Sequence, residues 1–249
     1  MPLTRPSYDQ AIGSICSILQ NYDLDKKFPV FGFGAKYGGV VRHCFQCGPT
    51  EEVDGVEGIQ NAYKQTFASG LVMSGPTVIT EVIETAAARA NSSQEEAAKE
   101  GKQKYTVLLI VTDGAVSDVA ATARCLNAVS QAPLSVIIVG IGGADFSGMR
   151  FLDDNNGSID IAQFVEFNDH RNDSASLTAA TLDEIPNQLE NYYIRHNIMP
   201  HPPVEVGEEE IVIQPEEDEI DLTIDFGSDG DIAVGSGGSG GVFVPPGAY

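Results

Sequence analysis

The stretch YTVLLIVTDG, residues 105–114, constrains the fold more than any other part of this chain. Residues 107–111 are an unbroken apolar run, and a carboxylate and a glycine, Asp113 and Gly114, follow shortly after it. Such a run is typical of a strand buried on both faces of a parallel sheet. Ligands of parallel sheets bind at the carboxyl ends of the strands. The sequence therefore predicts an α/β fold with Asp113 at a ligand-binding edge.

A second candidate ligand lies upstream, in the loop of residues 73–77, Met-Ser-Gly-Pro-Thr. A helical pattern starts at residue 78, so the loop places the Thr77 hydroxyl at a helix entrance. A hydroxyl and a carboxylate from separate loops, here Thr77 and Asp113, suit a hard cation such as Mg²⁺. Two ligands are too few for a complete site. Each residue also has a structural alternative, since Thr77 can be an N-cap and Asp113-Gly114 a simple turn.

Hydrophobic periodicity predicts alternating helices and strands. Helices are expected at residues 8–20, 56–67, 78–99, 119–129, 146–152 and 177–193, and strands at 28–33, 40–45, 105–112, 134–140 and 161–167. This order predicts a doubly wound, Rossmann-like parallel sheet with right-handed crossovers. With 249 residues, one such domain at 1–203 and a tail at 204–249 are expected. The tail is acidic and rich in Gly and Ser, a composition typical of disorder.

Charge and targeting signals limit the possible partners. The net charge is −22, and 12 of the 36 acidic residues lie at 201–249, where there is no Lys or Arg. The rest of the chain holds 24 acidic against 14 basic residues and offers no basic patch for phosphate backbones or anionic lipids. We therefore expect no nucleic-acid binding. No apolar run is long enough to span a membrane and no secretory signal is visible, so a cytoplasmic location is expected.

Eight blocks of sequence resemble one known family. They are YDQAI, NYDLDKKFPVFGFGAK, GVEGIQNAY, SGPT, YTVLLIVTDG, SVIIVGIGGADF, QFVEF and LDEIPNQLENYY. In this order, over about residues 6–203, the chain resembles the von Willebrand factor A-type (vWA) domain of copines, calcium-dependent phospholipid-binding proteins. The resemblance implies a protein-interaction domain with a metal-ion-dependent adhesion site (MIDAS). Thr77 and Asp113 then match two of its ligands, for Mg²⁺ or another divalent cation.

One part of the family pattern is absent from this sequence. The family has a DxSxS motif at the end of a first, central strand, which should precede Tyr8. We therefore expect an N-terminally truncated domain with an open slot in the centre of its sheet and weak or no cation binding. An alternative is that the tail supplies the strand through residues 220–230, IDLTIDFGSDG.

The functional hypothesis is a non-enzymatic adaptor of copine type with protein partners. Membrane contact would come only through C2 domains, which this sequence does not contain. An alternative is a substrate-recruiting A domain of a RING-type ubiquitin ligase. Hydrolase and nucleotide-binding chemistry is not expected, because the sequence has neither a GxSxG nor a Walker-type loop.

Overall fold

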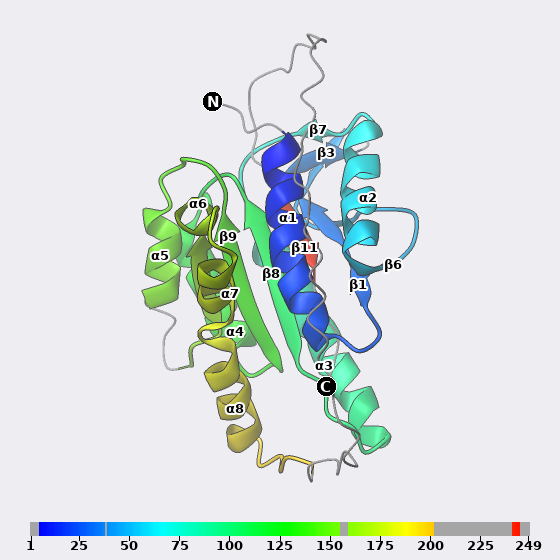
Figure 1. Cartoon of the computed structure of the whole chain (residues 1–249), viewed down its shortest axis with the longest axis vertical. Coiled ribbons are helices and arrows are strands. Elements are labelled where there is room, and N and C mark those ends of the chain that lie inside the picture. Colours follow the sequence, from blue (N-terminus) through cyan, green and yellow to red (C-terminus); the bar gives the residue numbers. More distant parts are fainter. Residues whose placement is uncertain (1–4, 38, 155–158, 202–240, 245–249) are drawn as a thin grey trace, which may run out of the picture.

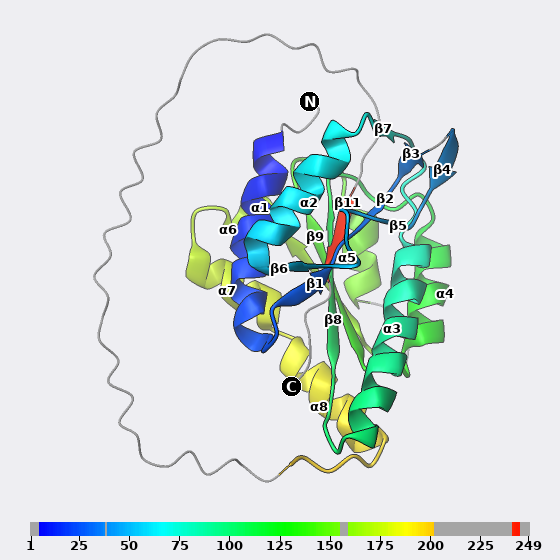
Figure 2. The same ribbon diagram turned by 90° about the vertical axis from the view of Figure 1, so that its right-hand side faces the viewer.

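A six-stranded sheet with the order β10-β9-β8-β11-β2-β5 forms the centre of the computed structural model (Figures 1 and 2). The structure describes residues 5–37, 39–154, 159–201 and 241–244. The strands of this sheet are β2 (Phe31–Phe33), β5 (Phe45–Gln46), β8 (Thr106–Thr112), β9 (Leu134–Gly140), β10 (Ala162–Glu166) and β11 (Gly241–Val244). Strands β8, β9 and β10 pair in parallel, whereas β11 and β5 pair antiparallel with their neighbours. The predicted parallel sheet is therefore confirmed for three strands.

Helices cover both faces of this sheet. Side chains alternate between the faces of a strand, so Leu109 and Val111 of β8 belong to one buried cluster and Leu108 and Ile110 to another. The first cluster includes α1 (Arg5–Leu19), α2 (Gly55–Ala68) and α7 (Ser174–Leu182). The second includes α3 (Thr80–Lys99), α4 (Val119–Val129) and α5 (Ser147–Asp154). The apolar run of β8 is thus buried from both sides, as the sequence predicts.

Two smaller sheets flank the main one. They pair β1 (Lys27–Pro29) with β6 (Glu52–Asp54), and β3 (Ala35–Tyr37) with β4 (Val40–Arg42) and β7 (Val72–Met73). The strands predicted at 28–33 and 40–45 are therefore each divided between two sheets.

Three helical segments complete the described part: η1 (Gln20–Tyr22), α6 (Phe167–His170) and α8 (Ile185–Arg195). The single helix predicted at 177–193 is wrong, because α7 ends at Leu182 and α8 starts at Ile185. Proline lacks a backbone N–H and favours the first helical turn, so Pro186 starts a new helix rather than continuing the old one. None of the helices in the described ranges is both long and apolar enough to cross a lipid bilayer.

The tail contributes β11, which lies between β8 and β2. The predicted open slot is therefore not observed, since β11 pairs with both strands that border it. Four residues of the expected tail, Gly241–Val244, thus form a strand. A run of Val-Phe-Val has a high β-propensity, which the average composition of the tail conceals. The alternative strand at 220–230 falls outside the described residues.

Candidate functional site

Asp113 directly follows β8, at the carboxyl edge of the three parallel strands. Thr112, the last residue of β8, lies in register with Gly140 of β9, and the Ile141 N–H donates to the Thr112 carbonyl at 2.8 Å. The chain bends after Thr112. The Thr112 hydroxyl donates to the Gly114 carbonyl at 2.9 Å, and the Gly114 N–H approaches the same hydroxyl oxygen at 3.3 Å. This local turn fixes the backbone on both sides of Asp113.

The Asp113 carboxyl is half-buried and only partly satisfied. Its Oδ1 is buried and has no hydrogen-bond partner among the described residues. Burial raises the pKa of Asp113, and a hydrogen bond from the Tyr8 hydroxyl acts in the opposite direction. Burial and the nearby charge of Asp113 in turn raise the pKa of Tyr8 well above its ordinary value. Tyr8 on α1 therefore acts as a hydrogen-bond donor to the carboxylate, and one oxygen remains for a ligand.

Thr77 is held beside the loop that follows Asp113. The Thr77 N–H donates to Ser117 Oγ at 2.9 Å, and the Ser117 N–H donates to the Thr77 carbonyl at 2.9 Å. Thr77 itself is 5% exposed. The alternative that Thr77 is an N-cap is wrong, because α3 starts at Thr80 and its N-cap position is Ile79. The two predicted residues thus belong to two loops that are hydrogen-bonded to each other.

These residues meet only part of the requirement for a cation site. A buried carboxylate oxygen without a partner, such as Asp113 Oδ1, is the kind of group that a hard cation satisfies. Within residues 5–37, 39–154, 159–201 and 241–244, however, no three His, Cys, Asp or Glu side chains are grouped to hold a metal. Thr77 and Asp113 therefore supply two oxygen ligands at most. Binding of Mg²⁺ or another divalent cation stays a prediction, and so does the expectation that it is weak.

Two contacts at this edge were not predicted from the sequence. Tyr8 was recognised only as part of a helical pattern, and its hydroxyl reaches Asp113 through tertiary packing of α1 on the sheet. Ser117 carries no recognisable sequence signal, because its partner Thr77 is 40 residues away.

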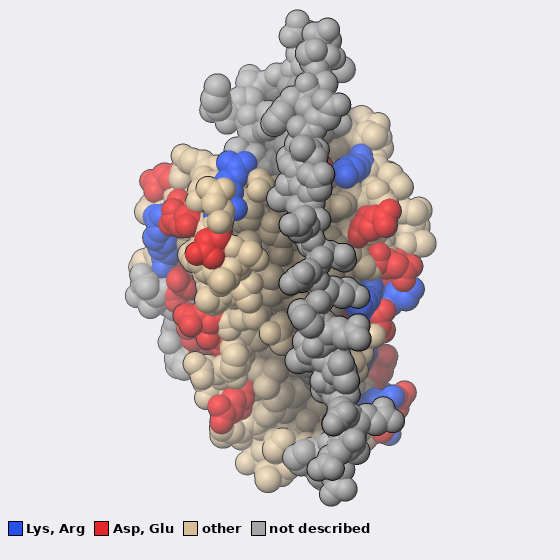
Figure 3. Space-filling model, viewed as in Figure 1, with Lys and Arg blue, Asp and Glu red and all other residues tan. Residues whose placement is uncertain are grey.

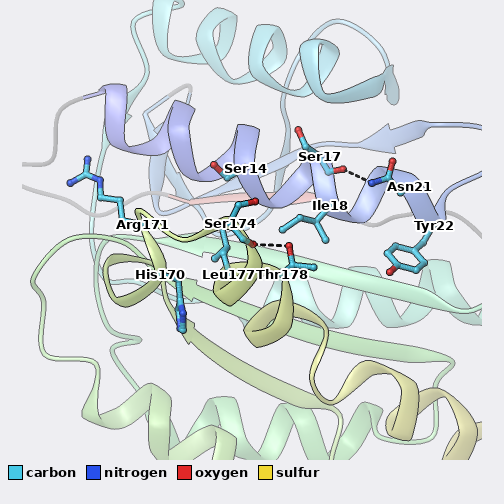
Figure 4. A pocket seen from close by; sticks show the side chains of 10 residues that line it. All are labelled: Ser14, Ser17, Ile18, Asn21, Tyr22, His170, Arg171, Ser174, Leu177 and Thr178. Carbon is cyan, nitrogen blue, oxygen red and sulfur yellow. Dashed lines mark hydrogen bonds between the residues drawn. The ribbon is translucent and has the colours of Figure 1, made fainter. Parts of the chain in front are cut away.

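Three of the pockets formed by the described residues have volumes of about 450 to 600 Å³, and neither Thr77 nor Asp113 lines any of these three. Figure 4 shows one of them, which is lined by Ser14 and Ser17 of α1, Asn21 of η1, and Ser174 and Thr178 of α7. The two basic side chains of its lining already have partners: Arg171 contacts Gln10 Oε1 at 3.2 Å and His170 Nδ1 lies 2.7 Å from Ser176 Oγ. We therefore place the candidate site at the carboxyl end of β8 because of the side chains that lie there, and not because of a pocket.

Basic and acidic side chains are interspersed on one face of the described chain. On the face shown in Figure 3, the described Lys and Arg side chains lie among Asp and Glu and form no continuous basic patch. A phosphate backbone requires a continuous basic surface.

Comparison with known proteins identifies the family. The copine family profile matches residues 2–201. Copine-C of Dictyostelium discoideum is 40% identical over 210 residues, which cover 79% of this chain and 38% of the relative. Protein BONZAI 1 of Arabidopsis thaliana is 39% identical over 212 residues, which cover 79% of this chain and 36% of the relative. The chain thus spans little more than a third of the length of these relatives, and it belongs to the copine family.

Proposed function

We propose that this chain is a protein-interaction domain of copine type, which recruits partner proteins and catalyses no reaction. The observation that carries the proposal is the family match over residues 2–201, which includes both loops of the candidate site. It is supported by the hydrogen bonds between Thr77 and Ser117, which join the Thr77 loop to the loop that follows Asp113. The activities of longer copines belong to the proposal only as far as this part of their sequence contributes to them.

We further propose that partner binding at this edge depends on a divalent cation held by Thr77 and Asp113. Such a cation supplies an open coordination position that a carboxylate of the partner can fill. The chain's own residues prepare the edge for it. Tyr8 orients the Asp113 carboxyl by a hydrogen bond, Oδ1 is left for the ligand, and Ser117 fixes the Thr77 loop. With only two protein ligands, the affinity for Mg²⁺ is expected to be weak, in the millimolar range that sites with few charged ligands show.

Titration calorimetry of the full chain with MgCl₂ tests the cation. The expected result is weak binding that Asp113→Asn abolishes and Thr77→Val weakens. Asp145→Asn is a matched control: Asp145 is an exposed carboxylate in the loop after the neighbouring strand β9, and its Oδ1 accepts from the Ser147 N–H at 3.0 Å. Equal Mg²⁺ binding by the wild-type protein and Asp113→Asn would show that the cation binds elsewhere.

Affinity purification with the full chain, in Mg²⁺ and in EDTA, tests partner recruitment. We expect proteins that the wild type retains in Mg²⁺, and that are lost both in EDTA and with Asp113→Asn. A set of bound proteins that is identical in all three conditions would refute the cation-dependent mechanism, and no specific protein in any condition would refute the adaptor function.

The ubiquitin-ligase alternative is a second candidate from the sequence, but no observation on the described residues favours it. The relatives reported above are a copine and a BONZAI protein. We therefore argue the adaptor function alone.

A further inference from the structure

The pocket between α1 and α7 has a lining that differs in chemistry from the candidate site at β8. Its volume of about 450 Å³ lies within the range of about 300–1,000 Å³ that small-molecule sites occupy. Ser and Thr hydroxyls, an Asn, a Tyr, a His and an Arg line it, together with the apolar side chains of Ile18 and Leu177. None of these described lining residues is Asp or Glu, although 36 of the 249 residues of the chain are acidic. An anionic group can therefore enter this pocket without meeting a carboxylate in its lining.

Arg171 gives the pocket a positive charge that is not compensated. Its Nε and Nη2 atoms both donate to Gln10 Oε1, each at 3.2 Å. This partner is neutral, and no Asp or Glu among the described residues forms an ion pair with the guanidinium. Because a guanidinium has five N–H donors, most of them remain for a ligand. Gln10 thus holds Arg171 in place without neutralising it.

Hydroxyl groups from both helices add donors and acceptors. The side chains of Ser14 on α1 and Ser174 on α7 form no hydrogen bond with another described residue, so each hydroxyl can donate and accept. The Ser17 hydroxyl donates to the Gly13 carbonyl at 2.6 Å. The Thr178 hydroxyl donates to a backbone carbonyl of its own helix at 2.8 Å. The oxygens of these last two hydroxyls therefore remain available as acceptors, and the pocket can exchange hydrogen bonds in both directions with the hydroxyl groups of a ligand.

The charge and the hydroxyls occupy different parts of the pocket. Figure 4 shows Arg171 at one end of the lining and Tyr22 at the other, with the serine side chains between them. A planar guanidinium binds two oxygens of a phosphate at once, which makes Arg well suited to phosphate recognition. A ligand that carries a phosphate at one end and hydroxyl groups along its body would match this order.

We propose that this pocket is a binding site for a phosphorylated polyol, such as a sugar phosphate or an inositol phosphate. Arg171 binds the phosphate, and Ser14 and Ser174 bind hydroxyl groups of the polyol. The same chemistry is present in free compounds and in the inositol phosphate headgroup of a lipid. The site is independent of the cation proposed above, because neither Thr77 nor Asp113 lines the pocket.

Titration calorimetry of the full chain in EDTA, with inositol monophosphate as the probe, tests the site. We expect saturable binding that is tighter than the binding of inositol or of inorganic phosphate, because only the combined ligand uses both parts of the pocket. Equal binding of inorganic phosphate and inositol monophosphate would overturn the proposal, since the polyol would then contribute nothing. Absence of saturable binding would overturn it as well.

Two substitutions in the pocket and one outside it locate the binding. Arg171→Gln should weaken the binding of inositol monophosphate at least about tenfold, and Ser14→Ala about three- to tenfold, because each loses a hydrogen bond to the ligand. Arg124→Gln is the matched control: Arg124 is exposed on α4 and, like Arg171, forms no ion pair with a described residue. Both arginines are exposed, so neither substitution disturbs the core. Equal weakening by Arg124→Gln and Arg171→Gln would show that only the net charge matters and would overturn the proposal.

Sedimentation with vesicles distinguishes the two sources of the ligand. The vesicles consist of phosphatidylcholine with or without phosphatidylinositol phosphate. Retention that requires phosphatidylinositol phosphate and is lost in Arg171→Gln identifies the lipid headgroup, whereas calorimetric binding without retention identifies a free compound, and both results support the proposal. Retention that is equal in the wild type and in Arg171→Gln would overturn it, because another surface would then bind the headgroup.

Discussion

The hydrogen bond between Tyr8 and Asp113 leads to the most direct prediction about the candidate site. Tyr8 is 6% exposed and donates to a carboxyl that is itself half-buried. Tyr8→Phe removes the hydroxyl and leaves the ring in place, so the packing against Tyr63, with ring centroids 5.8 Å apart, is retained. The substitution therefore isolates the donor. A hydrogen bond to a charged group contributes about 1.5–3 kcal/mol, so Tyr8→Phe should lower the free energy of unfolding at pH 7 by about that amount.

The decrease in the free energy of unfolding caused by Tyr8→Phe should depend on pH, and the direction of this dependence follows from the pKa of Asp113. Burial raises this pKa above its ordinary value of 3.8, so the folded state binds a proton more tightly than the unfolded state. At pH values above the pKa of Asp113 in the folded state, the buried charged carboxylate therefore destabilises the folded protein. At pH values below its pKa in the unfolded state, this destabilisation is absent. Removing the Tyr8 donor raises the folded pKa further. The destabilisation by Tyr8→Phe is then largest at neutral pH and smaller as the pH falls towards 4.

Urea unfolding of both proteins between pH 7 and pH 4 measures this difference, and thermal unfolding should show a shift of about 3–12 °C at pH 7 for a domain of this size. Tyr105→Phe is the matched control, because Tyr105 is also buried and its hydroxyl lies 2.9 Å from a neutral partner, Ser135 Oγ. Tyr105→Phe should lower the free energy of unfolding by about 0.5–1.5 kcal/mol, and this decrease should be the same over the whole pH range. If Tyr8→Phe behaves like Tyr105→Phe at every pH, the hydroxyl does not stabilise a charge and our description of the site is wrong.

Three further predictions concern the scaffold. Leu109→Ala should cost about 2–5 kcal/mol in urea unfolding, because Leu109 is 0% exposed in the strand next to β11; a loss below 1 kcal/mol would show that the sheet centre is loosely packed. Asp118→Ala should cost about 0.5–2 kcal/mol, because Asp118 Oδ1 accepts from the Ala121 N–H at 2.8 Å and caps α4, whereas Asp118→Asn should cost less. Burial, followed by the charge of Asp160, raises the pKa of Glu184 to about 7, so stability is lost as the pH rises from about 4.5 to 7. Glu184→Gln should therefore raise the melting temperature at pH 8 and leave it unchanged at pH 4, and an equal effect at both would refute the shift.

Local sequence patterns were sufficient where an element is determined by its own residues. The helix predicted at 119–129 and the strand predicted at 134–140 coincide with α4 and β9. Strand β9 is an apolar run buried at all seven positions, and α4 has a capping aspartate directly before it. In both cases periodicity, composition and boundary signals agree, which is the condition under which such predictions succeed.

Tertiary pairing decided the elements that were predicted poorly. Residues 28–33 read as one strand, yet Phe28 pairs with Val53 of β6 and Phe31 with Gln46 of β5. The local pattern does not indicate that the two halves join different sheets, because the strands with which they pair lie outside the short stretch of sequence from which a hydrophobic pattern is read. The order of elements was therefore predictable, but the division of short strands among three sheets was not.

In the candidate site too, the ligands could be predicted from the local sequence, whereas their contacts with residues distant in the sequence could not. Asp113 could be placed from the sequence because the end of a buried strand defines the edge of a parallel sheet. Thr77 could be proposed for its hydroxyl and its loop, but its hydrogen bonds to Ser117 could not. The donor of Asp113, Tyr8, lies 105 residues away in the sequence and reaches it only because α1 packs on β8. Residue chemistry thus identified the candidate ligands, and only the fold shows what holds them.

Strand β11 illustrates why a gap in a fold can be predicted more readily than the segment that fills it. The gap follows from a general property of sheets, because two strands that face one another across one strand's width need a partner. The filling segment has no comparable signature: Val242-Phe243-Val244 is three apolar residues between glycines and prolines, too short to be assigned as a strand on periodicity alone. Its pairing energy comes from β2 and β8, so it is a strand only in their presence. The stability of the sheet centre should consequently depend on the C-terminal segment, although by sequence that segment belongs to the tail.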